Sequence, residues 1–267
     1  MIQNIKYFNN LEQFFKSSLQ SHEVLFIDLN CQSIGDKGLS RLGSDLGKCI
    51  NISNLALQLW SNQIGDEGIS SLGSNLIKCT NISNLTLDLS YNQISNKGVL
   101  CLSSDLGKCP NLSNLKLNFQ SNQIGAIGGS GLGSGLGKCT NLSNLKLYLQ
   151  WNQIDDEGLS GLGSGLGKCT NLSNLTLDLY KNKIGDKGIQ DLGFGLGNCT
   201  NLQNLTLNLY YNQIEIGVLG LAYGLRKCSH LINLTLNLNK ISNQKSEQLK
   251  EKFLKTKRLV VLKICQH

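Results

Sequence analysis

Apolar residues follow two alternating patterns along this chain, and the pair of patterns returns about every 30 residues. Within one unit, leucine first occupies every second position: Leu175, Leu177 and Leu179. This spacing is typical of a strand whose two faces meet different surroundings. Apolar residues then step by three and four positions: Ile189, Leu192, Leu196 and Cys199. That spacing predicts a helix with one apolar stripe, so each unit is a strand, a turn and a helix.

Eight such units predict eight strands and a weaker ninth. The strands are expected near residues 24–30, 54–60, 84–90, 114–120, 144–150, 174–180, 204–210 and 233–239, with the ninth at 259–264. A unit with one apolar face on each element cannot bury that face alone, so neighbouring units must stack around a shared core. No linker interrupts the repeats, and we therefore expect one continuous domain.

Atypical segments at both ends are expected to close the array. Residues 1–23 contain a helical stripe with no preceding strand: Leu11, Phe14, Phe15 and Leu19. Residues 240–267 contain a second stripe within a lysine-rich helix: Leu249, Phe253 and Leu254. We predict an N-terminal capping helix at 1–23, eight repeats of about 30 residues at 24–239 and a basic C-terminal cap at 240–267.

The core phrase of each unit resembles the leucine-rich repeat. In one unit this phrase is Leu172, Leu175, Leu177, Leu179, Asn182 and Ile184. The long unit, its glycine-bearing helix and its Cys-x-x-Leu opening are similar to the ribonuclease-inhibitor subtype, and the asparagine and lysine richness resembles leucine-rich-repeat chains of ciliates. The resemblance implies an α/β fold: a right-handed solenoid, or horseshoe, with a parallel concave sheet of about eight to nine strands and helices on the convex side. Two extra residues in each strand predict a wider sheet than the family pattern has.

Short polar residues stand where the predicted helices begin: Asp36, Asp66, Asn96, Asp156 and Asp186. Their side chains can accept hydrogen bonds from the free N–H groups of the first helical turn. Ala126 and Ile216 occupy the same position in units four and seven, so those helices are expected to begin less cleanly. Glycines inside the helices, such as Gly133 and Gly135, each cost about 0.5 to 1 kcal/mol relative to alanine, which packing must offset.

Cysteine and asparagine form two further rows. Cysteine ends each helix: Cys49, Cys79, Cys109, Cys139, Cys169, Cys199 and Cys228. Adjacent units should lie too far apart there for a disulfide, so we interpret these residues as reduced, buried packing groups in an intracellular, cytoplasmic protein. Asparagine follows each strand: Asn62, Asn92, Asn122, Asn152, Asn182 and Asn212. We expect these side chains to satisfy the backbone of the turn.

The net charge of +7 is concentrated at the C-terminal end. Eight basic and two acidic residues lie in 240–267, which leaves the rest of the chain nearly neutral. A nucleic-acid-binding solenoid would spread its basic residues along the groove, so nucleic acid is not the expected partner. The basic cap could instead attract an acidic partner. No stretch reaches the roughly 20 apolar residues of a membrane span, and the opening lacks the apolar core of a signal peptide.

The chain contains no recognisable catalytic constellation. Its three histidines, His22, His230 and His267, lie near the two ends and match no motif. No CxxC pair suggests a zinc site, and the acidic residues at 155–157 are interpreted as a solvated helix start. We therefore predict a protein that is not an enzyme and that needs no metal or cofactor.

The informative positions vary while the scaffold repeats. The first outward-facing strand column holds Ala56, Thr86, Lys116, Lys146, Thr176, Thr206 and Thr235. The middle column holds Asp28, Gln58, Asp88, Asn118, Tyr148, Asp178, Asn208 and Asn237. The last column holds Trp60, Ser90, Gln120, Gln150, Tyr180 and Tyr210, and a turn column beyond it holds Ser61, Tyr91, Ser121, Trp151, Lys181 and Tyr211. Seven of the nine tryptophans and tyrosines fall in these columns, which makes the strand face a candidate protein-binding surface.

We predict a non-catalytic scaffold or adaptor that binds a partner protein on the concave strand face. The expected contact residues are Trp60, Asp88, Tyr91, Lys116, Lys146, Tyr148, Trp151, Asp178, Tyr180, Tyr210 and Tyr211. One alternative is a structural subunit of a large cytoskeletal or ciliary assembly. A further alternative is a GTPase-activating regulator of the Ran GTPase-activating type, although the chain has only three arginines and no outstanding insertion loop.

Overall fold

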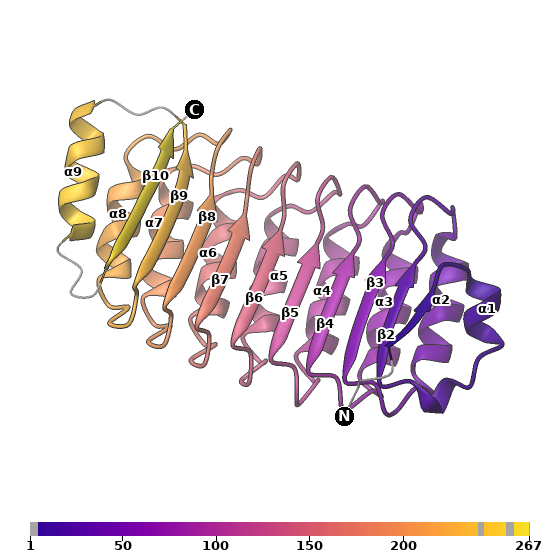
Figure 1. Cartoon of the computed structure of the whole chain (residues 1–267). Coiled ribbons are helices and arrows are strands. Elements are labelled where there is room, and N and C mark those ends of the chain that lie inside the picture. The colour runs from indigo at the N-terminus through magenta and orange to yellow at the C-terminus, as the bar shows by residue number, and fades with distance from the viewer. Residues whose placement is uncertain (1–4, 240–242, 255–258, 267) are drawn as a thin grey trace.

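The computed structural model describes residues 5–239, 243–254 and 259–266. Ten parallel strands form one open sheet in which each strand pairs with the next along the chain (Figure 1). The strands are β1 (Ile5–Phe8), β2 (Val24–Asp28), β3 (Asn54–Gln58), β4 (Asn84–Asp88), β5 (Asn114–Asn118), β6 (Asn144–Tyr148), β7 (Asn174–Asp178), β8 (Asn204–Asn208), β9 (Asn233–Leu238) and β10 (Val261–Gln266).

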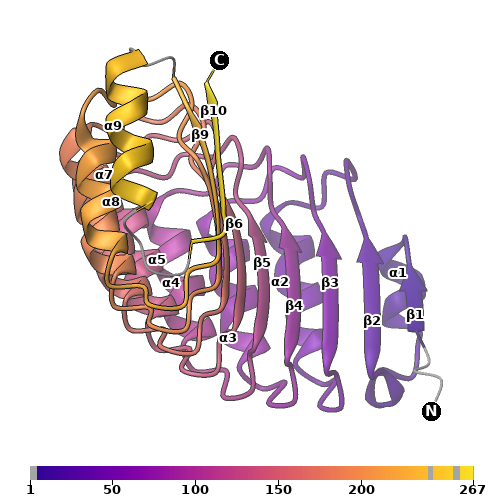
Figure 2. The ribbon, with the colours of Figure 1, turned by 60° about the vertical axis from the view of Figure 1, so that its left-hand side comes forward.

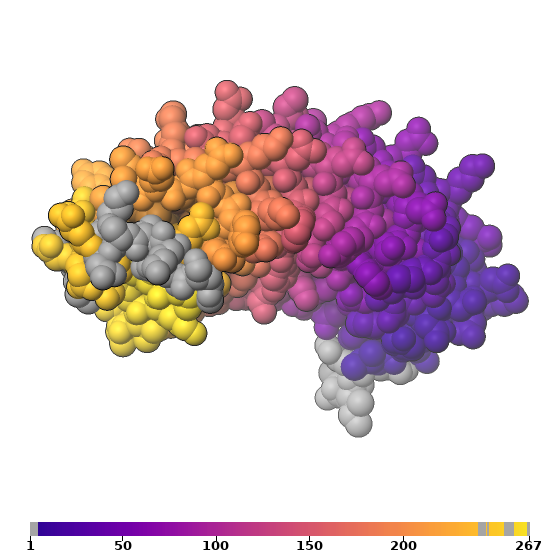
Figure 3. Space-filling model, turned by 90° about the horizontal axis from the view of Figure 1, so that it is seen from above, coloured from indigo at the N-terminus to yellow at the C-terminus, as the bar shows by residue number. Residues whose placement is uncertain are grey.

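Helices cover one face of this sheet, and the other face is open (Figure 2). They are α1 (Leu11–Phe15), α2 (Gly35–Leu46), α3 (Asp66–Leu76), α4 (Asn96–Leu106), α5 (Ala126–Leu136), α6 (Asp156–Leu166), α7 (Asp186–Leu196), α8 (Gly217–Leu225) and α9 (Asn243–Leu254), with a short 3-10 turn η1 (Leu19–Ser21). From above, the molecule is a curved body that is hollowed on the side of the sheet (Figure 3).

Identical residues stack because the register between neighbouring strands equals the repeat length. Asn84 pairs with Asn114, and Leu85 pairs with Leu115. The alternate leucines of every central strand are buried, as are the apolar residues of each helical stripe and the seven cysteines of the row. The predicted α/β solenoid with one shared leucine core is therefore confirmed.

The ends of the array differ from the prediction in one respect. A strand does precede the N-terminal helix, because β1 pairs in parallel with β2 from Ile5↔Val24 to Phe8↔Ile27. The sequence prediction missed it because three of its four residues are exposed and show no alternation. At the other end Leu249 and Phe253 are buried as predicted, and the side chain of Leu254 lies outside the described residues.

The strands are shorter than predicted, with five residues in each of β2 to β8 where seven were expected. Backbone pairing nevertheless continues past the strand end. The Leu59 N–H donates to the Asp88 carbonyl (2.8 Å), and the Ser61 N–H donates to the Ser90 carbonyl (3.0 Å). The two extra residues therefore extend the hydrogen-bonded backbone while the chain already turns out of strand geometry.

The polar residues at the helix starts act between repeats, so the prediction that each caps its own helix is wrong. The Gly65 N–H donates to the Asp36 carboxylate of the previous repeat (2.7 Å), and the Gly98 N–H donates to Asp66 (2.9 Å). Each side chain thus satisfies the start of the following helix, and the free N–H groups that a helix N-terminus leaves become contacts between coils.

This arrangement also changes what Ala126 does. Helix α5 is as long as its neighbours, because Asn96 of the previous repeat accepts from Gly125 N–H (2.8 Å) and Gly128 N–H (2.9 Å). The expected weak start of unit four is therefore wrong. Ala126 itself has no side-chain acceptor for the start of the next helix, α6. There Asp155 accepts from the Gly158 N–H of its own helix instead (3.0 Å). In unit seven, α8 is indeed shorter, with nine residues from Gly217.

The asparagine row after the strands has the structural role predicted for it. The Asn122 side chain accepts from the Ile94 N–H (3.0 Å) of the previous repeat and donates to the Leu89 carbonyl (2.9 Å). Corresponding bonds recur at Asn92, Asn152 and Asn182. Buried backbone groups of each turn are therefore satisfied by the next coil, which fixes the turns in register.

Candidate protein-binding face

The open face of the sheet presents the predicted columns to solvent. Lys116 and Lys146 of the first column are exposed, and Asp88, Tyr148 and Asp178 of the middle column are half-buried. The side chains alternate with the buried leucines of the core, as the period of two predicts. The structure therefore places these five residues on one surface.

The aromatic residues of the last and turn columns gather at the end of the strands in two groups. Trp60 and Tyr91, with ring centroids 6.0 Å apart, form the first. The second links four rings: Trp151 to Tyr180 (5.9 Å), Tyr180 to Tyr210 (5.8 Å) and Tyr211 (5.5 Å), and Tyr210 to Tyr211 (4.6 Å). Four of these side chains remain 40% to 56% exposed: Trp60, Tyr91, Trp151 and Tyr211. The two groups form an aromatic edge along the sheet.

Polar neighbours hold the aromatic edge in place. The Gln120 side chain donates to the Tyr91 hydroxyl (3.0 Å), between the two groups. Lys181 lies with its ammonium group 3.5 Å from the centroid of the Trp151 ring, within the range of a cation–π contact. The rings are therefore oriented before any partner arrives, which lowers the entropy lost on binding.

The turn column has a left-handed backbone in every central repeat. Tyr91 (φ 55°), Trp151 (φ 56°), Lys181 (φ 53°) and Tyr211 (φ 61°) all adopt it, although large side chains rarely do. The asparagine row and the paired N–H groups impose this geometry, as when the Tyr91 N–H donates to the Gln120 carbonyl (2.8 Å). The backbone directs these side chains outward at a cost in strain, and such strained positions cluster at functional sites.

The two acids of the middle column are engaged within the sheet. Asp88 accepts from the Ser90 hydroxyl (2.6 Å) and from the Asn118 amide (3.1 Å). Asp178 accepts from the Tyr180 N–H (3.1 Å), and burial raises the pKa of its carboxyl although that bond and the Asn208 side chain act in the opposite direction. These acids therefore organise their neighbours within the sheet.

The two lysines of the first column line a groove at the beginning of β4, β5 and β6, with a volume of about 430 Å³. Its floor contains Asn84, Asn114 and Asn144, which belong to an asparagine column that the sequence reasoning did not single out. The Asn114 amide donates to the Asn84 side chain (2.6 Å), and equivalent bonds run along the sheet from Asn54 to Asn233. The signal was available, because asparagine opens every strand from β3 to β9.

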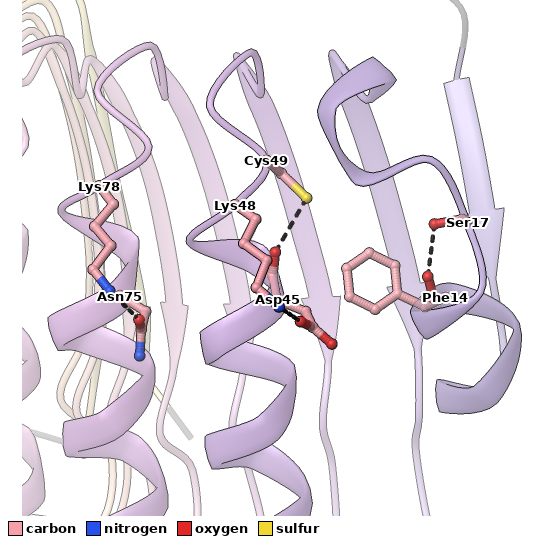
Figure 4. Close-up of polar contacts among 7 residues, drawn as sticks. All are labelled: Phe14, Ser17, Asp45, Lys48, Cys49, Asn75 and Lys78. Atoms are coloured by element: carbon pink, nitrogen blue, oxygen red, sulfur yellow. Dashed lines mark hydrogen bonds and ion pairs between the residues drawn. The ribbon is translucent and has the colours of Figure 1, made fainter.

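A further row of lysines follows the helices, on another side of each coil, as Figure 4 shows for the first two: Lys48, Lys78, Lys108, Lys138, Lys168 and Lys227. Lys78 donates to the Asn75 side chain of its own helix (2.8 Å), and Lys108 pairs with Asp105 (2.7 Å). Cys49 of the buried row donates to the Asp45 carbonyl (3.5 Å). Desolvation raises the pKa of each buried thiol, for Cys199 to about 12, which disfavours the reactive thiolate.

Within the basic C-terminal segment, Lys250 pairs with Glu247 (2.8 Å), and Lys252 and Lys263 are exposed. Lys240, Lys255, Lys257 and Arg258, and the side chain of Lys245, lie outside the described residues. In the part of the chain that the structure describes, no three His, Cys, Asp or Glu side chains are grouped to hold a metal ion, and no helix is long and apolar enough to span a membrane.

Comparison with protein families finds five matches to the model described as leucine-rich repeat, at residues 55–73, 81–103, 111–133, 141–163 and 171–193. A comparison with curated protein sequences gives no match. The matched segments begin within or just before the strands and end within the helices, so they cover the part of each coil that builds the open face.

Three solved structures are similar to parts of this chain. Internalin C2 from Listeria monocytogenes is 24% identical with a TM-score of 0.39, over 76% of this chain and 75% of that chain. The internalin inlF from the same organism is 20% identical with a TM-score of 0.37, over 93% and 76%. Actin-binding site 2 of leiomodin-1 is 16% identical with a TM-score of 0.37, over 48% and 71%. All three TM-scores are below 0.5, so these similarities do not extend to function.

Proposed function

Because this chain is a leucine-rich-repeat protein, we propose that it is a non-catalytic scaffold that binds a partner protein on the open face of its sheet. Leucine-rich-repeat proteins commonly mediate protein–protein interaction. The observation that carries the proposal is the aromatic edge, where large side chains lie exposed at the strand ends instead of packing into the core. Aromatic residues held on a rigid surface are the usual centres of binding energy at interfaces.

Trp60, Tyr148, Tyr180 and Tyr210 are the proposed anchors. They come from four different repeats, so a partner that touches all of them must lie across the curved sheet. The neighbouring columns would supply specificity through Lys116, Lys146, Asp88 and Asp178, together with Tyr91, Trp151 and Tyr211 in the turn column. A folded partner or a long segment fits this spread of contacts better than a small ligand does.

We also propose that the repeats belong to the ribonuclease-inhibitor-like subtype and form one continuous domain between an N-terminal and a C-terminal cap. The α-helix in every repeat, of nine to twelve residues, supports the subtype. An intracellular location is part of the proposal, because the seven buried thiols occupy equivalent sites as hydrogen-bond donors and packing groups.

Affinity purification with identification of the captured proteins tests the binding proposal. The test variant replaces Trp60, Tyr148, Tyr180 and Tyr210 by alanine. The matched control replaces Phe194 and Tyr223, an exposed aromatic pair on the helical side with ring centroids 6.1 Å apart. We expect the four-residue variant to lose the partner, since each anchor should contribute about 2 kcal/mol, and the control to keep it. Equal recovery with both variants would contradict the assignment of the site.

A further inference from the structure

The lysine pair on β5 and β6 provides a more specific inference, which rests on the proposed function. In the first column, the other strands from β3 to β9 carry alanine or threonine: Ala56, Thr86, Thr176, Thr206 and Thr235. The end strands β2 and β10 carry Phe26 and Lys263 there. Lys116 and Lys146 are direct neighbours in the register of β5 and β6. Adjacent strands lie about 4.8 Å apart, and like charges placed opposite one another destabilise a sheet. The chain therefore concentrates positive charge where folding alone favours a neutral residue.

The positive charge of the two lysines is not neutralised by a direct ion pair in the part of the sheet that the structure describes. The Lys116 ammonium group lies 5.6 Å from the centroid of the Tyr148 ring, within the range of a cation–π contact. Asp88 and Asp178 flank the pair from the middle column, and each is hydrogen-bonded to its own surroundings.

The polar side chains on the floor of the groove beside the lysines already form hydrogen bonds with one another. The Asn114 amide donates both to Asn84 (2.6 Å) and to the Ser113 hydroxyl (3.1 Å), and its carbonyl oxygen accepts from Asn144. The floor therefore offers few free donors, and the two ammonium groups are its strongest sites for an anion. Because the asparagine side chains are neutral, selectivity for charge must come from the lysines.

We propose that Lys116 and Lys146 receive an acidic segment of the protein partner, with an aspartate or glutamate carboxylate bound between the two ammonium groups. A carboxylate there removes the repulsion between the lysines and gains a charge-assisted hydrogen bond from each. Tyr148 lies beside the pair, so an apolar residue next to the acid in the partner would pack on its ring. Asp88 and Asp178 repel carboxylates on either side, which fixes the acid at this one position along the sheet.

The experiment uses the whole chain and a defined probe: a capped nine-residue peptide in which aspartate alternates with glycine. A peptide with asparagine in place of aspartate is the neutral control. Binding is followed from the backbone amide signals of β5 and β6 in NMR spectra, at about 0.05 M and about 0.5 M salt, because screening weakens contacts between exposed charges. We expect only the acidic peptide to shift these signals, and the shifts to shrink at high salt.

Two double variants test whether peptide binding depends on Lys116 and Lys146. The variant Lys116→Thr with Lys146→Thr introduces threonine, which already occupies this column at Thr86 and Thr176, so the fold should be kept. Lys138→Thr with Lys168→Thr removes the same charge from exposed positions at the helix C-termini. We expect the first variant to bind the acidic peptide about tenfold more weakly, and the second to bind it like the parent protein.

Two outcomes would overturn the inference: equal binding of the neutral peptide, or undiminished binding by the Lys116→Thr and Lys146→Thr variant. Failure here is distinct from failure of the proposed function. A partner that is lost with the four aromatic anchors but kept by the lysine variant would support the scaffold and contradict the acidic contact. Loss of the partner with the lysine variant, alongside lost peptide binding, would support both.

Discussion

The glycines of the helical layer and the large residues of the turn column both occupy backbone positions that their side chains disfavour. Glycine is a poor helix former, yet α5 and α6 together contain nine glycines, from Gly128 to Gly165. Tryptophan and tyrosine are poor residues for a left-handed backbone, yet Trp151, Tyr91 and Tyr211 adopt it. The two regions differ in what compensates the cost.

In the helical layer the compensation is visible in the contacts. A Cβ atom at Gly165 would overlap with the Gly133 backbone, and one at Gly195 would overlap with the Gly163 backbone. Glycine is therefore required for adjacent helices to pack this closely. At Trp151 and Tyr211 the side chains remain about half exposed, so the fold regains little for the strain. A residue that is unfavourable for its backbone but allows closer packing has a structural role. A residue that is unfavourable and gains little packing indicates a binding surface.

The largest expected effect on stability comes from alkaline pH, which acts on the buried cysteine row. Burial raises the pKa of the Cys199 and Cys228 thiols from an ordinary value of 9.0 to about 12. The folded state then holds protons that the unfolded chain releases, so this stability is complete below pH 9 and is lost as the pH rises from 9 towards 12. The loss is at most about 1.4 kcal/mol per thiol for each pH unit.

Thermal unfolding between pH 7 and pH 11 measures this dependence. Replacing Cys199 and Cys228 by alanine should flatten the curve above pH 9, whereas replacing the exposed Cys31 should leave its shape unchanged. A curve of the same steepness without the two buried thiols would show that other groups control it.

Gly165→Ala is expected to lower the free energy of unfolding by about 3 kcal/mol, because the new methyl group forces α5 and α6 apart. Helix propensity alone predicts a gain of about 1 kcal/mol, so the sign of the change decides between the two. Chemical denaturation gives the value, and Ser164→Ala on the exposed side of the same helix is the control. A more stable Gly165→Ala protein would remove the structural explanation for the glycines.

Asn152→Ala should cost about 2 kcal/mol, because it leaves the Ile124 N–H without its acceptor and removes one of the two side-chain donors to the Phe119 carbonyl. Both groups are buried between coils, beside the left-handed Trp151. The control is Gln153→Ala, whose side chain is exposed. Denaturation curves for the two variants separate the asparagine row from a general effect of removing an amide, and similar stabilities would contradict its assigned role.

Trp151→Gly is expected to change stability least, by less than about 1 kcal/mol. Relief of the left-handed backbone offsets the lost contacts with Tyr180 and Lys181. The same variant should bind the partner much more weakly, which a titration measures. Ser61→Gly relaxes the same column without removing a ring and should leave binding intact. A large loss of stability at Trp151 would instead place it among the structural residues.

Residues that repeat were predictable from the sequence, since one physical environment recurs in every unit. The leucine alternation, the helical stripe, the cysteine row and the asparagine at Asn122 all give local patterns that have a single interpretation. The pattern of apolar residues did not reveal β1, because a mostly exposed strand at the end of the sheet has no buried face and so shows no alternation of apolar and polar residues. The hydrogen bonds of Asp36 and Asp66 were also misassigned, since a side chain reaching the next coil looks the same in sequence as one that caps its own helix.

The candidate site was predictable only as a set of columns. Sequence placed Trp60, Tyr148 and Tyr180 on one face, but the contacts between rings depend on where each strand turns. The left-handed turn column gave no signal, because glycine, which usually marks such a backbone, is absent from it. Asp178 looked like a charged contact residue, and its burial and internal hydrogen bonds appeared only in the structure.

Photo-crosslinking tests most directly whether the partner occupies the open face. Benzoylphenylalanine is introduced either at Ser61 in the turn column or at Ser164 on the helical side, both of which are exposed. Both positions accept a large ring, since Tyr91 and Phe194 occupy them in the following repeats. The account predicts a covalent adduct with the partner from position 61 and none from position 164. An adduct from position 164 alone would contradict it.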